Sequence, residues 1–151
     1  MDRLIMMIAT GFYTGYLPKA PGTWGTLVAF PLHFLLLRLP GTMYYPALGV
    51  IFLLAVFTAG GAEKILDRCD PGLIVIDEII GMLIALIAVP LKIVPLACAF
   101  LLFRFFDIVK PFPVGWVDFH LHGGLGIVLD DVVAGIYTLI IMQLLTYFLG
   151  W

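Results

Sequence analysis

Hydrophobic positions divide the chain into five apolar runs, separated by polar or proline-containing segments. The runs cover residues 24–39, 47–62, 73–89, 96–109 and 132–149. A bilayer core of about 30 Å requires about 20 helical residues, so the shorter runs could cross it only if they were tilted or extended into their flanks. The pattern predicts an all-α fold, a small polytopic membrane bundle of about five hydrophobic helices, some short or tilted.

The segments between the runs carry the turn signals and most of the charge. Residues 63–72 form the most polar stretch of the chain. Residues 110–129 are rich in glycine and proline and are expected to form a long loop. The apolar stretch 4–9 is shorter than a signal-peptide core of about 7–15 residues, so we expect an interfacial or re-entrant lead-in there.

Composition supports the membrane interpretation. The chain is 63% hydrophobic and 12% charged, whereas ordinary soluble domains contain about 25% charged residues. Its mean hydropathy is +1.14, and its net charge of −2 provides no basic footprint for nucleic acid. These values exclude a soluble enzyme, a disordered chain and a nucleic-acid-binding protein, and they favour one integral-membrane domain over residues 1–151. Cys69 and Cys98 are expected to be free thiols.

Basic residues predict how the chain is oriented in the membrane. If the five runs alternate in direction, Arg38 and Lys92 fall on one side of the bilayer and the other basic residues on the opposite side. That opposite side carries Arg3, Lys19, Lys64, Arg68, Arg104 and Lys110. The side richer in basic residues is expected to be cytoplasmic. Every carboxylate falls on this same side, in loops or at the ends of runs.

Two adjacent acids interrupt the third run. Asp77 and Glu78 stand among isoleucine, valine and leucine residues. Ionised carboxylates at membrane depth are costly and are usually paired or functional. The alternative is an interface position, from which the two side chains simply reach water.

A second charged group ends the fourth run. Arg104, Asp107 and Lys110 are spaced by three residues, so one helical face is expected to present a cation, an anion and a cation. The alternative is a structural ion pair at a helix end. Pro111 and Pro113 are expected to end the helix.

A third group precedes the last run. A glycine-rich stretch, residues 123–126, leads to Asp130 and Asp131. One of the two acids is explained as a helix N-cap. Paired acids call for a counter-ion, and their oxygen ligands favour a hard divalent cation such as Mg²⁺ over Zn²⁺. Gly135 would allow another helix to approach closely.

Other polar residues are weaker candidates. Thr23 is either an N-cap or, with Lys19, part of a phosphate-binding helix N-terminus. His33 is expected to be a hydrogen-bonded packing residue. Asp118, His120 and His122 form an Asp-x-His-x-His pattern that could bind zinc, but the expected flexible loop and the lack of further Cys or His partners disfavour this.

Four segments resemble the phosphatidylglycerophosphatase A family of bacterial lipid phosphatases. They are residues 21–27, 75–81, 103–113 and 123–135, and they occur in the family's order. The resemblance implies a Mg²⁺-dependent phosphatase of the bacterial inner membrane; together with the apolar runs and the basic residues, this predicts a multi-pass protein with its active site on the cytoplasmic side. Its substrate and partner would be the phospholipid phosphatidylglycerophosphate, converted within the bilayer to phosphatidylglycerol and phosphate.

Combining the residues with the resemblance gives a working assignment of roles. The expected catalytic residues are Asp77, Glu78, Asp107 and Asp131. The expected metal ligands are Asp77, Glu78, Asp130 and Asp131. Arg104 and Lys110 are expected to bind the phosphate, and Lys19 and Thr23 are weaker candidates for the same contact. Two rival functions are a small carrier that uses intramembrane carboxylates and a non-catalytic membrane subunit; clustering of acids on one side disfavours the carrier.

Overall fold

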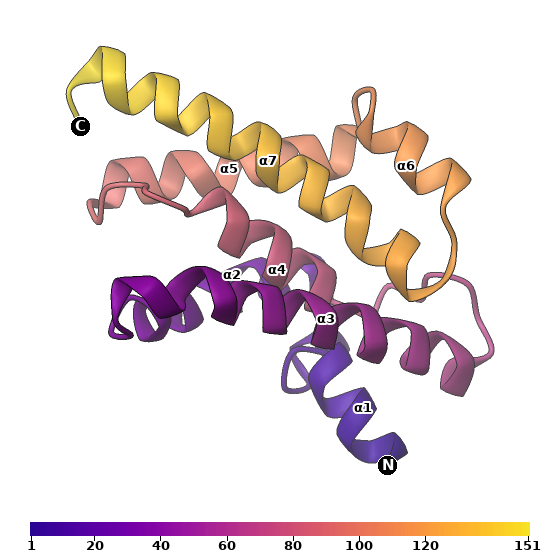
Figure 1. The fold of residues 1–151 in the computed structure, drawn as a ribbon. Helices are drawn as coiled ribbons and strands as arrows, with labels where there is room; N and C mark the ends of the chain where they lie inside the picture. The colour runs from indigo at the N-terminus through magenta and orange to yellow at the C-terminus, as the bar shows by residue number, and fades with distance from the viewer.

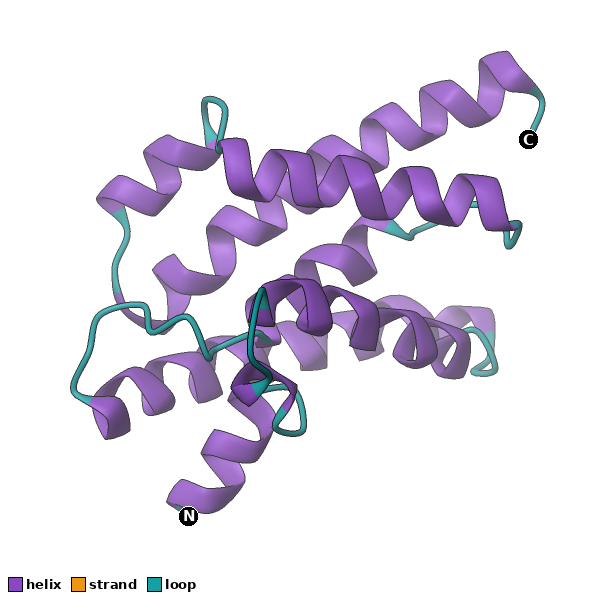
Figure 2. Ribbon diagram, turned by 180° about the vertical axis from the view of Figure 1, so that it is seen from behind, coloured by secondary structure: helices purple, strands orange, loops and turns teal.

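The computed structural model describes residues 1–151 as seven α-helices and one 3₁₀ turn, with no strands (Figures 1 and 2). The elements in order are α1 (Asp2–Ala9), η1 (Thr14–Tyr16), α2 (Pro21–Leu36), α3 (Gly41–Leu66), α4 (Ile76–Ala85), α5 (Ile93–Val109), α6 (Val114–His120) and α7 (Gly123–Leu149). The predicted all-α class is confirmed.

Each of the five apolar runs contains a helix, but the helices differ in length. By length and composition, α3 with 26 residues and α7 with 27 are the two that could cross a membrane. The third run forms only the 10-residue α4, about 15 Å long at about 1.5 Å per residue. The two apolar helices indicate membrane association. That about five helices span the membrane stays a prediction.

The predicted loop over residues 110–129 is wrong. It contains α6 and the first two turns of α7, which begins at Gly123. A side chain at Gly124 would place its Cβ 2.1 Å from the Val56 carbonyl oxygen. Glycine at this position therefore lets α7 lie directly against α3. Residues 123–126 are therefore helical rather than loop, and Gly124 is the position of close contact with α3.

α7 is the central element of the packing, and it contacts α3, α4, α5 and α6. The short α4 lies inside the bundle, and most of its apolar side chains are buried. By contrast, large apolar side chains on α3 and α7, among them Leu53, Phe57 and Phe148, are exposed. An apolar exterior of this kind suits a lipid environment.

The molecule has two chemically different ends (Figure 1). The connections between α3 and α4, between α5 and α6, and between α6 and α7 lie at one end, which we call the acidic end. The α2–α3 and α4–α5 connections and the C-terminus lie at the other, which we call the far end. The sequence contains no carboxylate over residues 3–62 or 79–106, which include both far-end connections.

Candidate functional site

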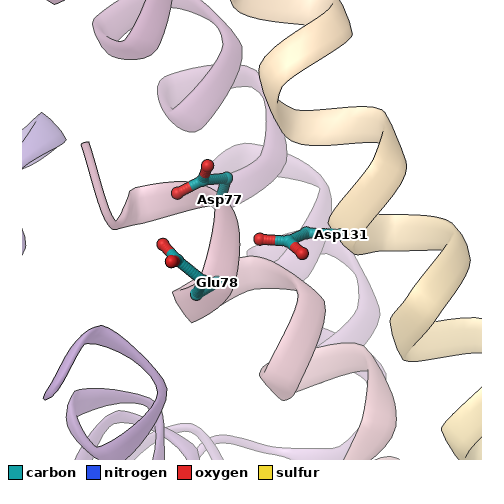
Figure 3. Close-up of side chains that lie close together, drawn as sticks. All are labelled: Asp77, Glu78 and Asp131. Atoms are coloured by element: carbon teal, nitrogen blue, oxygen red, sulfur yellow. The ribbon is translucent and has the colours of Figure 1, made fainter. Parts of the chain in front are cut away.

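Three carboxylates from two helices meet inside the bundle. Asp77 and Glu78 lie in the first turn of α4, and Asp131 lies in the interior of α7. One oxygen from each of the three lies within 4.8 Å of the others (Figure 3). Asp77 is 8% exposed and Asp131 is 3% exposed, so the group lies beneath the surface. We call these three residues the carboxylate cluster.

A close helix crossing explains why the cluster forms. Gly81 follows Asp77 by four residues, and Gly135 follows Asp131 by the same interval. A Cβ on Gly135 would lie 2.3 Å from the Gly81 carbonyl oxygen, so α4 and α7 touch through their backbones here. Residues four apart lie on the same helical face. The crossing that brings the two glycines together therefore brings the two aspartates together one turn earlier.

The cluster lacks internal compensation for its negative charge. Asp77 Oδ1, Glu78 Oε2 and Asp131 Oδ1 are buried and have no hydrogen-bond partner. Buried charges of one sign are costly unless they are paired or coordinate a cation. The donor atoms are all carboxylate oxygens, which suit a hard divalent cation. The residues present therefore fit a divalent metal ion.

Arg104 flanks the cluster from α5. Its Nη1 donates a hydrogen bond to Asp107 Oδ2 at 2.5 Å and lies 3.9 Å from Glu78 Oε1. The predicted face shared by Arg104 and Asp107 is confirmed, and it is turned toward the cluster.

Lys110 does not share that face, because α5 ends at Val109 and Lys110 adopts a left-handed conformation with φ +47°. Its Nζ lies 2.6 Å from Asp118 Oδ1 and 2.7 Å from Asp130 Oδ2. Burial works to lower the pKa of Lys110, but hydrogen bonds to the two aspartates outweigh it and raise the pKa above its ordinary value. Lys110 therefore ties the end of α5 to α6 and α7.

Asp130 lies outside the carboxylate cluster. Its Oδ2 accepts the hydrogen bond from Lys110, and its Oδ1 is buried without a partner. The prediction of an N-cap role for one of the two acids is wrong. Both lie within α7, and His122 occupies the N-cap position without a side-chain capping bond.

The N-terminus of α2 lies against the site. A Cβ on Gly22 would fall 2.1 Å from Glu78 Oε1 and 3.0 Å from Arg104 Nη1. Thr23 lies inside the first turn of α2 and is not its N-cap, which is Ala20. Lys19 and Ala20 both have positive φ, +68° and +50°, although neither is a glycine. The exposed Lys19 forms no ion pair, and the Thr23 side chain forms no hydrogen bond.

The remaining polar candidates have structural partners. His33 is buried, and its Nδ1 lies 3.1 Å from the Tyr44 hydroxyl, which confirms the packing role. His120 bonds the Trp116 carbonyl through Nδ1 at 2.8 Å, and no metal-type cluster includes His120 or His122. Cys69 and Cys98 are free thiols, as expected.

Sequence reasoning missed two features of the site. It did not assign Gly81 and Gly22 the close contacts that shape the site, and it did not pair Asp118 with Lys110. The shared spacing Asp-x-x-x-Gly in residues 77–81 and 131–135 was the available signal for the helix crossing. No signal in the sequence pointed to the ion pair between Lys110 and Asp118.

Together, the fold and the site define a membrane-associated helical protein with a buried acidic cluster suited to a metal ion. Residues 7–146 match the family described as Phosphatidylglycerophosphatase A. This chain belongs to the phosphatidylglycerophosphatase A family and is a phosphatase.

Three relatives align with nearly the whole chain. Phosphatidylglycerophosphatase A of Haemophilus influenzae is 40% identical, over 96% of this chain and 90% of its own length. The Escherichia coli protein of the same name is 38% identical, over 95% and 82%. A putative phosphatidylinositol-3-phosphatase of Bacteroides thetaiotaomicron is 38% identical, over 97% and 96%. No solved structure matches the chain.

Proposed function

We propose that this protein is a Mg²⁺-dependent lipid phosphatase. It hydrolyses the terminal phosphomonoester of phosphatidylglycerophosphate to phosphatidylglycerol and phosphate. Family membership and two relatives named for this activity support the substrate. The observation that carries the proposal is the carboxylate cluster: Asp77 and Asp131 are buried, Glu78 is partly buried, each has a buried oxygen without a hydrogen-bond partner, and one oxygen from each lies within 4.8 Å of the others.

Asp77, Glu78 and Asp131 are the proposed metal ligands. Asp130 is also a proposed metal ligand, but only its Oδ1 is available, because its Oδ2 accepts a hydrogen bond from Lys110. When bound, Mg²⁺ would act as a Lewis acid that offsets negative charge on the phosphoryl oxygens. The short α4 and the interior of α7 are rigid supports, so they hold the ligands in place before a lipid arrives.

Arg104 is the proposed phosphate-binding residue. Asp107 accepts a hydrogen bond from Nη1 and fixes the guanidinium beside the cluster, while the other N–H groups can donate to phosphate oxygens. Lys110 is proposed to add positive charge and to hold Asp130. The N-terminus of α2, with Lys19 and Thr23, completes the anion site, because helix N-termini favour negative charge.

The proposed reaction is hydrolysis by water. The water oxygen forms a new P–O bond, the P–O bond to the lipid glycerol breaks, and a proton moves from water to the leaving oxygen. Asp107, with Asp77, Glu78 and Asp131, forms the pool of carboxylates that can accept and return this proton. Asp107 lies beside Arg104, and therefore beside the proposed phosphate position.

We further propose a multi-pass arrangement in the bacterial inner membrane, with residues 1–151 as one domain and the acidic end facing the cytoplasm. The excess of basic residues on the predicted cytoplasmic side supports this orientation. A site at the headgroup level would reach the phosphate while the lipid tails stay in the bilayer.

Phosphate release by purified protein in detergent tests the proposed function. Phosphatidylglycerophosphate is the substrate, with Mg²⁺ titrated from zero. We expect Mg²⁺-dependent release that falls at least about 100-fold in Asp131→Asn. Asp2→Asn is the matched control, because it removes an exposed acid from α1. Absence of release by the wild type, or full activity in Asp131→Asn, would contradict the proposal and favour a non-catalytic subunit or a carrier.

Phosphatidylinositol 3-phosphate is the second candidate substrate, favoured by the name of the Bacteroides thetaiotaomicron relative. Both lipids present a phosphomonoester, and they differ in the bulk of the group that carries it. The ratio of kcat/KM for the two substrates, measured with the same preparation, decides between them. A higher value for the inositol lipid would replace the proposed substrate and leave the proposed site unchanged.

A further inference from the structure

A cavity of about 340 Å³ lies at the far end, away from the carboxylate cluster. The end of α2, the start of α3 and the connection between α4 and α5 form its wall. α4 links the two sites, because Asp77 lies in its first turn and Leu86, directly after its last residue, lines the cavity. We call this space the far-end cavity.

The wall of the far-end cavity suits hydrocarbon. Ten of its twelve lining residues are hydrophobic, among them Leu36, Leu86 and Leu91. The only ionisable side chain in the wall apart from the tyrosines is His33, and its Nδ1 lies 3.1 Å from the hydroxyl of Tyr44, with which it forms a hydrogen bond. An apolar cavity of about 150 Å³ already holds a benzene-sized molecule. The far-end cavity is therefore large enough for a stretch of acyl chain.

Two cations are sequence neighbours of residues in the cavity wall, although they do not line it themselves. Arg38 lies between Leu37 and Leu39, and Lys92 follows Leu91; these three leucines line the cavity. Both cations are exposed and form no ion pair. No carboxylate occurs over residues 3–62 or 79–106. The far end therefore presents uncompensated positive charge beside an apolar space.

We propose that the far-end cavity binds an anionic phospholipid, with one acyl chain inside it and the lipid phosphate on Arg38 and Lys92. An apolar cavity beside cations matches a molecule with a hydrocarbon chain and a negative headgroup. The site is separate from the carboxylate cluster, and it does not depend on the proposed phosphatase activity.

Native mass spectrometry of the purified full-length protein in detergent tests the proposal. Dioleoyl phosphatidylglycerol and dioleoyl phosphatidylcholine, which share acyl chains and differ in headgroup charge, are titrated separately. We expect one phosphatidylglycerol molecule to be retained per protein, with affinity about tenfold higher than that for phosphatidylcholine. Equal affinity for the two lipids would overturn the proposed role of Arg38 and Lys92.

Filling the cavity tests where the lipid binds. Gly41 lines the cavity, and a Cβ placed there meets no atom within 4 Å, so Gly41→Leu adds bulk without a backbone collision. We expect this variant to lose the retained lipid. Gly49→Leu is the matched control, because Gly49 also lies in α3 with open space around its Cβ but outside the cavity wall. Unchanged lipid retention in Gly41→Leu would overturn the proposal.

Charge removal tests the headgroup contact. The double variant Arg38→Gln/Lys92→Gln is expected to bind the two lipids with equal affinity. Arg3→Gln/Lys64→Gln removes two exposed cations elsewhere, on α1 and the last turn of α3, and is expected to keep the preference for phosphatidylglycerol. Loss of the preference in this control instead would overturn the assignment to the far end.

The same preparation distinguishes lipid binding from dimer formation at the cavity, and it distinguishes the lipid proposal from the phosphatase proposal. A dimer in the wild type that disappears in Gly41→Leu would assign the cavity to a second copy of the chain and overturn the lipid proposal. Gly41→Leu is expected to keep the wild-type rate of phosphate release, because Gly41 lies far from the cluster. An inactive wild type would contradict the phosphatase proposal while leaving the lipid result valid.

Discussion

Asp131 and its two partners place three acidic groups within 4.8 Å of one another in the protein interior. Without a cation, these groups repel each other and lack hydrogen-bond partners for one oxygen each. Functional sites commonly carry such a stability cost. The cluster is therefore expected to destabilise the metal-free protein and to stabilise the metal-bound one.

The first prediction concerns Asp131→Asn. In EDTA, the variant is expected to unfold at a temperature equal to or above that of the wild type, because one repelling charge is removed. Mg²⁺ at 100 times its Kd should stabilise the wild type by about 2.7 kcal/mol and the variant by much less. Thermal unfolding in detergent measures both effects. Equal stabilisation of the two proteins by Mg²⁺ would show that the ion binds elsewhere.

The second prediction concerns Lys110, which neutralises Asp130 on one side and Asp118 on the other. Lys110→Met leaves the buried Asp130 without its cation and is expected to lower the free energy of unfolding by about 3 kcal/mol. Asp118→Asn removes the more exposed partner, whose side chain is 43% exposed, and is expected to cost less than about 1 kcal/mol. Urea unfolding in detergent compares the two. A similar loss of unfolding free energy in the two variants would contradict the larger role of the ion pair between Lys110 and Asp130.

At the scale of helices, the crossing of α4 and α7 sets the spacing of the proposed metal ligands. The third prediction is that Gly135→Ala, which pushes α7 away from the Gly81 carbonyl oxygen, shifts the metal preference from Mg²⁺ toward larger ions. Mg²⁺ requires ligand distances of about 2.0–2.1 Å, whereas Ca²⁺ accepts about 2.3–2.6 Å. Binding constants for Mg²⁺, Mn²⁺ and Ca²⁺ measure the shift.

Gly124→Ala is the control for this prediction. A Cβ at position 124 would lie 2.1 Å from the Val56 carbonyl oxygen, about as close as the Cβ at position 135 lies to the Gly81 carbonyl oxygen, but this contact is at the crossing of α7 with α3. We expect a comparable loss of stability with an unchanged order of metal preference. A Gly135→Ala protein that keeps the wild-type order of metal affinities would contradict the proposed link between the crossing and the site.

The sequence singled out the three acids that the structure brings together, but it did not predict the bounds of the helices that carry them. Asp77 and Glu78 stood out because charge inside an apolar run is costly, and that cost does not depend on where the helix ends. Helix boundaries depend on packing: α4 is much shorter than its apolar run, and α7 begins earlier because Gly124 packs on α3. Convergence of Asp131 with Asp77 depended on the crossing of two helices that are distant in sequence.

At the scale of the whole molecule, the two ends carry different chemistry. The acidic end holds the cluster, and the connection between α3 and α4 at this end adds Asp67 and Asp70. The far end holds an apolar cavity and two unpaired cations. This difference supports a fixed orientation in a membrane, and the natural cysteines allow the orientation to be tested.

The fourth prediction uses Cys69, an exposed thiol in the connection between α3 and α4. In a Cys98→Ala background, a membrane-impermeant maleimide should label Cys69 in inverted membrane vesicles and not in right-side-out vesicles. A Thr42→Cys substitution in a chain without either native cysteine should give the reverse pattern, because Thr42 is exposed at the far end. Labelling of Cys69 from the outside would contradict a cytoplasmic acidic end.

The position of a bound metal ion tests the central claim most directly. Crystals of the protein grown with Mn²⁺ in place of Mg²⁺ would locate the ion by anomalous scattering. The expected result is a peak about 2.0–2.3 Å from carboxylate oxygens of Asp77, Glu78 and Asp131. A peak instead in the small polar pocket lined by Glu63, Asp70 and Asp118, or no peak at saturating Mn²⁺, would contradict the assignment of the carboxylate cluster as the metal site.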